Sequence, residues 1–292
     1  MEVVTSTKIT VPELARLKQA GQKIVMLTAY DFVTARVLDH SGAVDVVLVG
    51  DSLGTVVQGH DTTIPVTLDE MIYHSRMVSR GVNRALVIAD MPFMSFQLGA
   101  KEALEAAGRL MKEAGVAAVK LEGGRKYAET VRTIVEAGIP VMGHIGLLPQ
   151  SFHAMGGYKI QGKKGEEANA LIEDALSLQE AGAFSIVLEG IPAAVAARVT
   201  AAIDIPTIGI GAGPDCSGQV LVINDLMGFV NPGEGQTPKF VKQYFQLTSS
   251  MTSAVKQFGE EVRQGLFPGD EHVYSASSKQ KLSLHRGDKN RG

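Results

Sequence analysis

Acidic and basic side chains stand at the ends of consecutive short apolar runs in this sequence. They are Asp51, Asp90, Lys120, Glu122, His144 and Glu189. Burying a charge is costly, so a buried strand has little reason to finish on a charged side chain unless that charge is used. The set combines carboxylates that could bind a cation or accept a proton with one ammonium group and one imidazole.

Three of these carboxylates suit a hard divalent cation. Mg²⁺ takes oxygen ligands, commonly one or two protein carboxylates with substrate and water, and Asp51, Asp90 and Glu122 offer such oxygens. A cation held there could chelate a 2-oxo acid through its carboxylate and ketone oxygens and lower the cost of removing the adjacent proton. Glu189 would accept that proton, and Lys120 would neutralise the substrate carboxylate. The residue types therefore favour enolate chemistry.

Taken one at a time, the same residues also fit structural roles. Asp51 could cap a helix after its strand, and Asp90 could stabilise the Met-Pro turn that follows it. Lys120 and Glu122 alternate along one run and so share a face, where they could form a structural ion pair. The histidine could be a hydrogen-bonded core residue, and Glu189 could cap the next helix. Convergence of the whole group on one rim favours function.

Eight apolar runs alternate with longer segments of helical spacing. Continuous runs rich in Val, Ile and Leu are typical of parallel strands buried on both faces, so the alternation predicts an α/β fold, a single (β/α)8 TIM barrel. Active sites of such barrels lie at the carboxyl ends of the strands, where the charged residues stand. The runs cover residues 24–30, 44–50, 85–90, 117–123, 139–146, 184–190, 205–211 and 219–225.

The helices between these runs are visible in their apolar spacing. Apolar residues recur every three or four positions over residues 103–114 and 168–176. Both segments are followed by a glycine, Gly115 and Gly182, of the kind that ends helices in a left-handed conformation.

The two ends of the barrel sequence are less regular. Thr10 and Glu13 resemble a capping box, which predicts a helix over residues 11–20 that could close the barrel bottom. The run 219–225 could be the eighth strand or a helix, because the seven residues between it and the seventh run leave no room for a full helix. The segment 238–265 is helical by composition and would be the last outer helix.

An internal repeat supports the strand assignments. EAGVAAVKLEGG at residues 113–124 aligns without gaps with EAGAFSIVLEGI at residues 180–191. The alignment places Glu122 and Glu189 at equivalent positions at the ends of two strands. Both side chains are therefore expected at the same mouth of the barrel.

Length and composition limit the other possibilities. A chain of 292 residues with 45% hydrophobic content can bury one large core, so we expect one barrel domain over residues 1–274, with its N-terminal helix, and a disordered polar tail over 275–292. The net charge of −3 argues against nucleic-acid binding. Cys216 is the only cysteine, which excludes an intrachain disulfide and fits a cytoplasmic protein. No apolar stretch is long enough to predict a membrane span.

The glycine-rich segment 209–213 leaves two interpretations open. It follows the seventh run, where barrels often bind phosphate, but no clear helix starts directly after it to supply amide groups. Glycines that allow close approach of a flat cofactor are the other interpretation.

Several motifs together resemble the ketopantoate hydroxymethyltransferase family. The resemblance spans about residues 7–274, and the order and spacing of its motifs make it specific. The motifs are VLVGDSLG, QGHDTTIPVTLDEMIYH, ADMPF, VKLEGG, GHIGLLPQS, LEGIP, IGIGAG and the closing FPGDEHVY. The resemblance implies transfer of a hydroxymethyl group from 5,10-methylenetetrahydrofolate to the Mg²⁺-bound enolate of 3-methyl-2-oxobutanoate. The products would be 2-dehydropantoate and tetrahydrofolate, in pantothenate biosynthesis.

The resemblance also implies roles for individual residues. Asp51, Asp90 and Glu122 match the Mg²⁺ ligands of the family. Glu189 matches the proton acceptor, and His144 matches a pocket residue near the incoming hydroxymethyl group. The matched substrate-binding positions are Asp51, Ser52, Asp90 and Lys120. Beyond the site, the resemblance implies a barrel of the phosphoenolpyruvate mutase and isocitrate lyase type and a homodecamer built from dimers.

Two other functions compete with this one. The chain could be a different enolate enzyme of the same barrel type, such as a carbon–carbon lyase that uses no folate, and dependence on the folate donor separates the two. It could also be a catalytically silent barrel that serves as a binding protein, against which the intact acidic rim argues.

Overall fold

The computed structural model describes residues 7–229 and 237–274. The chain divides into two compact units, Met1–Phe245 and Gln246–Gly292. The expected single domain ending at residue 274 stays a prediction, and the expected disordered tail over 275–292 lies outside the described residues.

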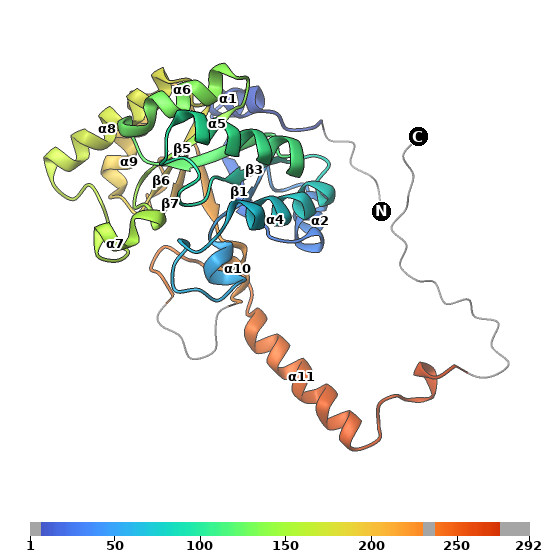
Figure 1. The fold of residues 1–292 in the computed structure, drawn as a ribbon. Helices are drawn as coiled ribbons and strands as arrows, with labels where there is room; N and C mark the ends of the chain where they lie inside the picture. The colour runs from blue at the N-terminus through green and yellow to red at the C-terminus, as the bar shows by residue number, and fades with distance from the viewer. Residues whose placement is uncertain (1–6, 230–236, 275–292) are drawn as a thin grey trace. The chain divides into compact units, whose positions relative to one another are not determined.

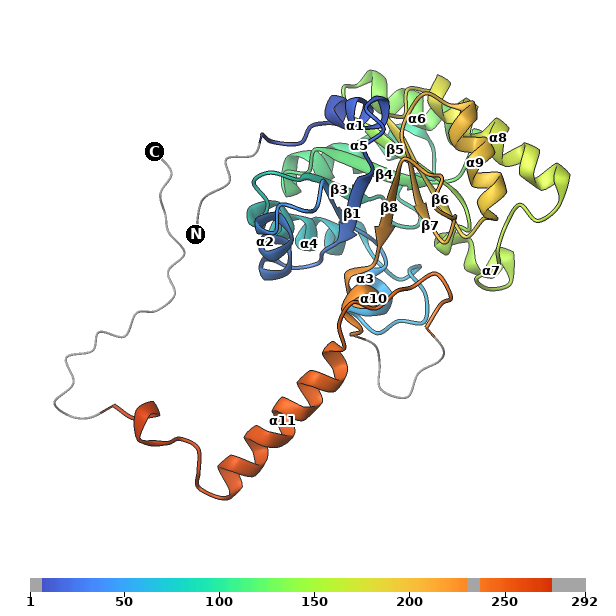
Figure 2. The ribbon, with the colours of Figure 1, turned by 180° about the vertical axis from the view of Figure 1, so that it is seen from behind.

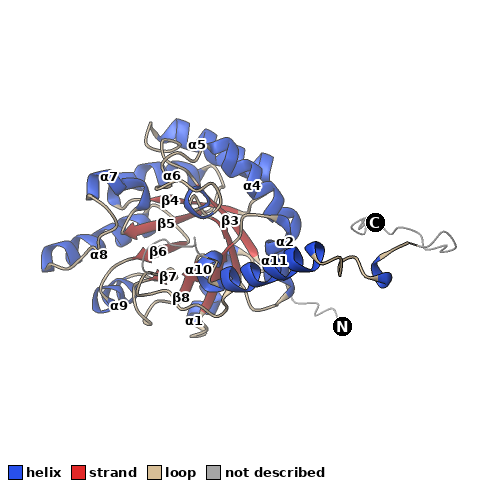
Figure 3. Cartoon of the chain, turned by 90° about the horizontal axis from the view of Figure 1, so that it is seen from below, coloured by secondary structure: helices blue, strands red, loops and turns tan. Residues whose placement is uncertain are grey.

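The first unit is a closed barrel of parallel strands in the order β1 to β8, as the sequence predicts. In Figure 3 the strands, drawn red, lie inside the surrounding helices. The strands are β1 (Ile24–Thr28), β2 (Val46–Val49), β3 (Leu86–Asp90), β4 (Ala118–Glu122), β5 (Val141–Gly146), β6 (Ser185–Glu189), β7 (Thr207–Ile210) and β8 (Gly218–Leu221).

Helices cover the outside of the barrel and its two ends. Those along the outside are α2 (Phe32–His40), α4 (Leu68–Gly81), α5 (Ala100–Arg109), α6 (Ala128–Glu136), α8 (Gly165–Glu180) and α9 (Ala193–Ala202). Figures 1 and 2 place α1 (Val11–Gln19) at one end and, at the other, α3 (Leu53–Val56), α7 (Phe152–Met155) and α10 (Ile223–Met227). Short helical turns are η1 (Leu110–Ala114), η2 (Arg125–Tyr127), η3 (Pro149–Ser151) and η4 (Asp270–His272).

The helix ends agree with the predicted spacing. α5 continues through the π-helical turn η1 and stops at Gly115, whose φ of 73° is left-handed. α8 is followed by Gly182 with a φ of 94°. Both glycines therefore end their helices as predicted, because a left-handed residue without a Cβ carries little steric cost.

Alternation along the strands separates the barrel core from the outer core. On β4, Val119 and Leu121 pack outward among the residues that contact the helices, whereas Ala118 packs inside the lower barrel. Lys120 and Glu122 continue the inward series toward the carboxyl end of the same strand. The period-two pattern therefore fills the bottom of the barrel with apolar side chains and leaves charged ones at its mouth.

Helix α1 closes the bottom of the barrel, as predicted. Its Leu14 is fully buried among the inward-facing residues of the strands. The predicted capping box is wrong, because Thr10 makes no side-chain bond to the helix and Glu13 pairs with Arg16 instead. The guanidinium one turn further on competes for the carboxylate that a capping box needs.

The structure settles the ambiguous run 219–225 and shortens the helix predicted over 238–265. The run 219–225 is part strand and part helix, since β8 ends at Leu221 and α10 begins at Ile223. Within 238–265 only α11 (Leu247–Arg263) is helical, in the second compact unit. Among the described residues, no helix combines the length and apolarity needed to cross a membrane.

Candidate active site

A cavity of about 100 Å³ opens at the carboxyl ends of the strands. The polar residues that the sequence singles out all line it, and they are Asp51, Ser52, Asp90, Lys120, Glu122, His144 and Glu189. They lie at or just after the carboxyl ends of five consecutive strands, β2 to β6, which the barrel brings side by side because parallel strands finish on one edge. The structure thus gathers the predicted residues, while their individual roles stay predictions.

A glycine turn sets the position of Asp51 and Ser52 after β2. A Cβ on Gly50 would lie 2.6 Å from Ser52 Oγ, so a larger residue at the strand end would displace the Ser52 hydroxyl. The Asp51 amide donates to Asp90 Oδ2 at 3.1 Å, and Ser52 Oγ lies 2.8 Å from the buried Tyr30 hydroxyl. Asp51 does not cap α3, because its carboxylate accepts a bond from Gln150 instead.

Adjacent strands bring Lys120 to Asp90. The two residues are paired in register between β3 and β4, and Lys120 Nζ lies 2.8 Å from Asp90 Oδ1. The two atoms are close enough for an ion pair, but their angles do not make a hydrogen bond. Asp90 Oδ1 is therefore buried with no hydrogen-bond partner. The ion pair that the alternation suggested between Lys120 and Glu122 is therefore not the one that forms.

His144 lies between two glutamates. Its Nδ1 is 3.5 Å from Glu122 Oε1, and its Nε2 is 3.2 Å from Glu189 Oε2. Lys120 Nζ also approaches Nδ1, at 3.4 Å. Glu189 does not cap α9, since Pro192 is the N-cap of that helix and no side-chain bond caps it. The imidazole therefore connects the equivalent glutamates of the internal repeat.

Burial makes this group of charges strongly interdependent. Burial and the charges of Asp90 and Glu122 raise the pKa of Asp51 well above its ordinary value. Burial opposes the charge on Lys120, but the surrounding carboxylates outweigh it and raise the pKa of that ammonium. Burial and Lys120 likewise oppose protonation of His144, yet Glu122 and Glu189 raise its pKa to about 9. Negative charge is thus in excess within the cavity wall.

The oxygen donors and the excess charge fit a divalent cation. Across the described residues no three acidic, histidine or cysteine side chains are already arranged as a metal centre. Asp51, Asp90 and Glu122 nevertheless supply the carboxylate oxygens that Mg²⁺ prefers, and Asp90 Oδ1 is buried without a hydrogen bond. A cation would offset the repulsion that raises the pKa of Asp51.

Two uncharged residues at the site do not stand out as charged strand ends in the sequence: Thr63, in the cavity wall, and Gln150, behind two of its carboxylates. Thr63 lines the cavity, and its buried hydroxyl has no hydrogen-bond partner among the described residues. Gln150 in η3 is 5% exposed and bonds both Asp51 and Glu122. Both lie inside motifs that resemble the family, HDTTIP and LLPQS, which was the available signal.

The glycine-rich segment after β7 packs against protein. A Cβ on Gly213 would lie 2.4 Å from the Ala193 side chain, and one on Gly211 would lie 3.0 Å from Phe240. These close approaches account for both glycines without a phosphate or a flat cofactor. Cys216 is fully buried, and burial raises the pKa of its thiol, so it is not an activated nucleophile.

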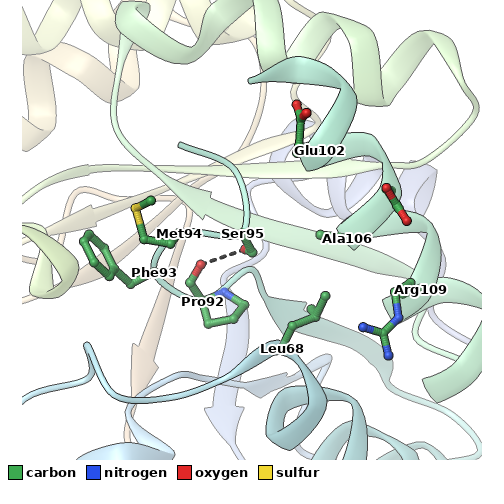
Figure 4. A pocket seen from close by; sticks show the side chains of 9 residues that line it. Leu68, Pro92, Phe93, Met94, Ser95, Glu102, Ala106 and Arg109 are labelled. Atoms are coloured by element: carbon green, nitrogen blue, oxygen red, sulfur yellow. Dashed lines mark hydrogen bonds between the residues drawn. The ribbon is translucent and has the colours of Figure 1, made fainter. Parts of the chain in front are cut away.

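A larger hollow of about 310 Å³ lies outside the barrel mouth, beside the β3–α5 loop and α5 (Figure 4). It shares no residue with the strand-end cavity. Its one guanidinium, Arg109, is already paired with Asp69 and Glu113. Although this hollow is larger, the described residues that line it offer no free cationic group and include none of the residues predicted to do chemistry.

Comparison with known proteins gives a consistent result. A family model described as ketopantoate hydroxymethyltransferase matches residues 8–270. The 3-methyl-2-oxobutanoate hydroxymethyltransferase of Syntrophotalea carbinolica is 56% identical over 266 residues, which cover 91% of this chain and 98% of that protein.

Solved structures show the same fold at low sequence identity. A 2,3-dimethylmalate lyase of the phosphoenolpyruvate mutase and isocitrate lyase superfamily has a TM-score of 0.56 and 17% identity over 94% of this chain and 93% of its own. A phosphonopyruvate hydrolase crystallised with oxalate and Mg²⁺ has a TM-score of 0.57 and 13% identity over 91% and 92% of the two chains. The barrel therefore shares its fold with these enzymes.

Proposed function

Because the chain belongs to the ketopantoate hydroxymethyltransferase family, we propose that its barrel converts 3-methyl-2-oxobutanoate to 2-dehydropantoate in pantothenate biosynthesis. The hydroxymethyl carbon would come from 5,10-methylenetetrahydrofolate, with tetrahydrofolate as the second product. The observation that carries the proposal is one cavity that joins carboxylates, an ammonium group and an imidazole to an apolar wall.

Asp51, Asp90 and Glu122 would hold the divalent cation, and Mg²⁺ suits their oxygen donors. When bound, the cation polarises the ketone of the substrate and lowers the cost of forming an enolate. The phosphonopyruvate hydrolase that shares this fold was crystallised with Mg²⁺ and oxalate, a small dicarboxylate, which supports a divalent cation here.

The remaining cavity wall suits a short branched 2-oxo acid. Lys120 offers an ammonium group, and Ser52 a hydroxyl, for the substrate carboxylate. The apolar part of the wall would contact the isopropyl group and consists of Leu48, Pro149, Val187, Ile210, Val220 and Val222. An apolar wall in so small a cavity favours a short apolar group over a charged or longer one.

Glu189 would move the proton. Its carboxylate is the most accessible of the acidic groups on the strands, with 21% of the side chain exposed, and it would accept the proton from C3. The new bond joins C3 to the methylene carbon of the donor, the carbon–nitrogen bonds to that carbon break, and one water supplies the hydroxyl group. His144 is in contact with Glu189 and would orient that carboxylate and approach the new hydroxymethyl group.

Assembly and location are part of the same proposal. Exposed apolar residues on α2, Phe32 at 38%, Val33 at 68% and Val37 at 63%, are consistent with a subunit interface, and we propose the homodecamer that the family resemblance implies. Analytical ultracentrifugation measures the number of subunits in the assembly directly. A cytoplasmic location fits the single buried cysteine.

A two-step assay tests the function. Purified protein with Mg²⁺ is expected to exchange the C3 proton of 3-methyl-2-oxobutanoate with deuterium, and to form 2-dehydropantoate once 5,10-methylenetetrahydrofolate is added. Exchange without transfer would indicate a different enolate enzyme. Absence of metal-dependent exchange would favour a silent barrel.

A further inference from the structure

Gln150 is the uncharged residue that connects the acidic strand ends. It lies in η3, the turn that follows β5, and is 5% exposed. Its backbone amide donates to Glu122 Oε2 at 3.0 Å, and its side-chain Nε2 donates to Asp51 Oδ2 at 2.9 Å. One residue thus bonds two carboxylates, one at the end of β4 and one in the turn after β2.

The orientation of the Gln150 amide is determined by its partners. Nε2 also donates to the carbonyl of Met91 at 2.9 Å, so both of its hydrogens face oxygen acceptors. The reversed amide would direct Oε1 at a carboxylate and a carbonyl, which is repulsive. Oε1 instead accepts a bond from Gln97 Nε2 at 3.1 Å. Gln97 therefore fixes the amide from its far side.

These bonds leave each carboxylate with one oxygen engaged by Gln150. A hydrogen bond to one oxygen restricts rotation of the carboxylate, so its second oxygen occupies a narrower range of positions. Asp51, Asp90 and Glu122 repel one another when ionised, and donors from Gln150 offset part of that repulsion. A purely structural glutamine tying the loop to Met91 would not need the two carboxylates.

We propose that Gln150 is a positioning residue that sets the orientation of Asp51 and Glu122 as cation ligands, with Gln97 holding its amide in place. The inference rests on the cation site of the proposed function. Partners of this kind, which touch ligands without touching the metal, change metal affinity by about 10–100-fold when removed.

The test measures Mn²⁺ binding to the full chain by calorimetry and electron paramagnetic resonance, without substrates. Gln150→Leu removes the side-chain bond to Asp51 and keeps the backbone bond to Glu122. It is expected to weaken Mn²⁺ binding by about 10–100-fold, and the manganese spectrum should broaden as Asp51 loses its fixed orientation. Gln97→Leu, which leaves Gln150 in place, should weaken binding by a smaller factor. If Gln150→Leu fails to fold, the Mn²⁺ affinity of Gln97→Leu tests the proposal in its place.

A matched control is Gln179→Leu. Gln179 is half-buried and accepts bonds from the amides of Asp204 and Ile205 away from the cavity, so its loss should leave Mn²⁺ affinity within about twofold of wild type. A folded Gln150→Leu protein with wild-type affinity overturns the inference, as does equal weakening in Gln179→Leu. Wild-type protein that binds no Mn²⁺ also overturns it.

The proposed function can fail separately. A wild-type protein that binds Mn²⁺ but makes no 2-dehydropantoate would refute the transferase assignment while the comparison of Gln150→Leu with Gln179→Leu remained decisive. Weaker metal binding in Gln150→Leu would then still assign the positioning role.

Discussion

Two segments with the same sequence template end in different surroundings. Residues 113–124 and 180–191 each run from a helix end through a strand, and each strand finishes on a glutamate. The Glu122 side chain is 5% exposed and accepts a bond from the Gln150 amide. The Glu189 side chain is 21% exposed, and its contact in the cavity is His144. Neighbouring strands and loops therefore distinguish two positions that the template makes equivalent.

The difference fits two chemical roles. A metal ligand benefits from a fixed orientation and exclusion of water, which the buried Glu122 has. A proton acceptor must reach substrate and later return its proton, which the more open Glu189 can do. Substituting each glutamate in turn, and measuring both proton exchange and Mn²⁺ affinity, tests this difference most directly.

Glu189→Gln should have the largest effect on catalysis. Removing a proton acceptor costs about 10²–10⁴-fold in rate, so C3 deuterium exchange of 3-methyl-2-oxobutanoate should fall by that factor. Mn²⁺ affinity should stay within about twofold of wild type, since Glu189 is not a proposed ligand. Undiminished exchange, followed by nuclear magnetic resonance, would remove Glu189 from the role of base.

Glu122→Gln should show the opposite profile. Mn²⁺ affinity measured by calorimetry should fall by at least the roughly 10-fold that loss of an outer partner costs, because a proposed ligand is lost. Exchange should recover in part at high Mn²⁺ concentration, which Glu189→Gln does not permit. Equal loss of metal in both variants would show that the two glutamates do not differ in role.

His144→Gln should have an intermediate effect, because His144 contacts both glutamates. We expect C3 exchange to slow by about 10-fold, with a much smaller further loss when Glu189→Gln is already present, since residues in contact are not additive. Full additivity in this double-mutant cycle would mean that His144 acts independently of Glu189.

Leu14→Ala should lower the stability of the barrel without changing the site that contains Glu122 and Glu189. Leu14 is fully buried at the barrel bottom, and truncating such a residue costs about 2–5 kcal/mol of unfolding free energy. Urea denaturation measures the loss, while Mn²⁺ affinity of the folded protein should match wild type. A change in affinity would show that α1 influences the barrel mouth.

Local pattern predicted most of the barrel. The apolar runs located every strand, because a strand buried on both faces leaves an uninterrupted hydrophobic signature. The prediction from a short motif was wrong at α1, because Glu13 pairs with Arg16 instead of completing a capping box with Thr10. It was also ambiguous at 219–225, where one apolar run spans a strand and a helix.

The sequence by itself determined that charged residues end the strands, because period-two alternation and barrel topology place Lys120, Glu122 and Glu189 at one mouth. Only the tertiary structure decided which groups meet there. It paired Lys120 with Asp90, placed His144 between the glutamates and brought Gln150 to Asp51. Such contacts join residues distant in the chain, and their distances depend on strand register and loop path, which no local spacing encodes.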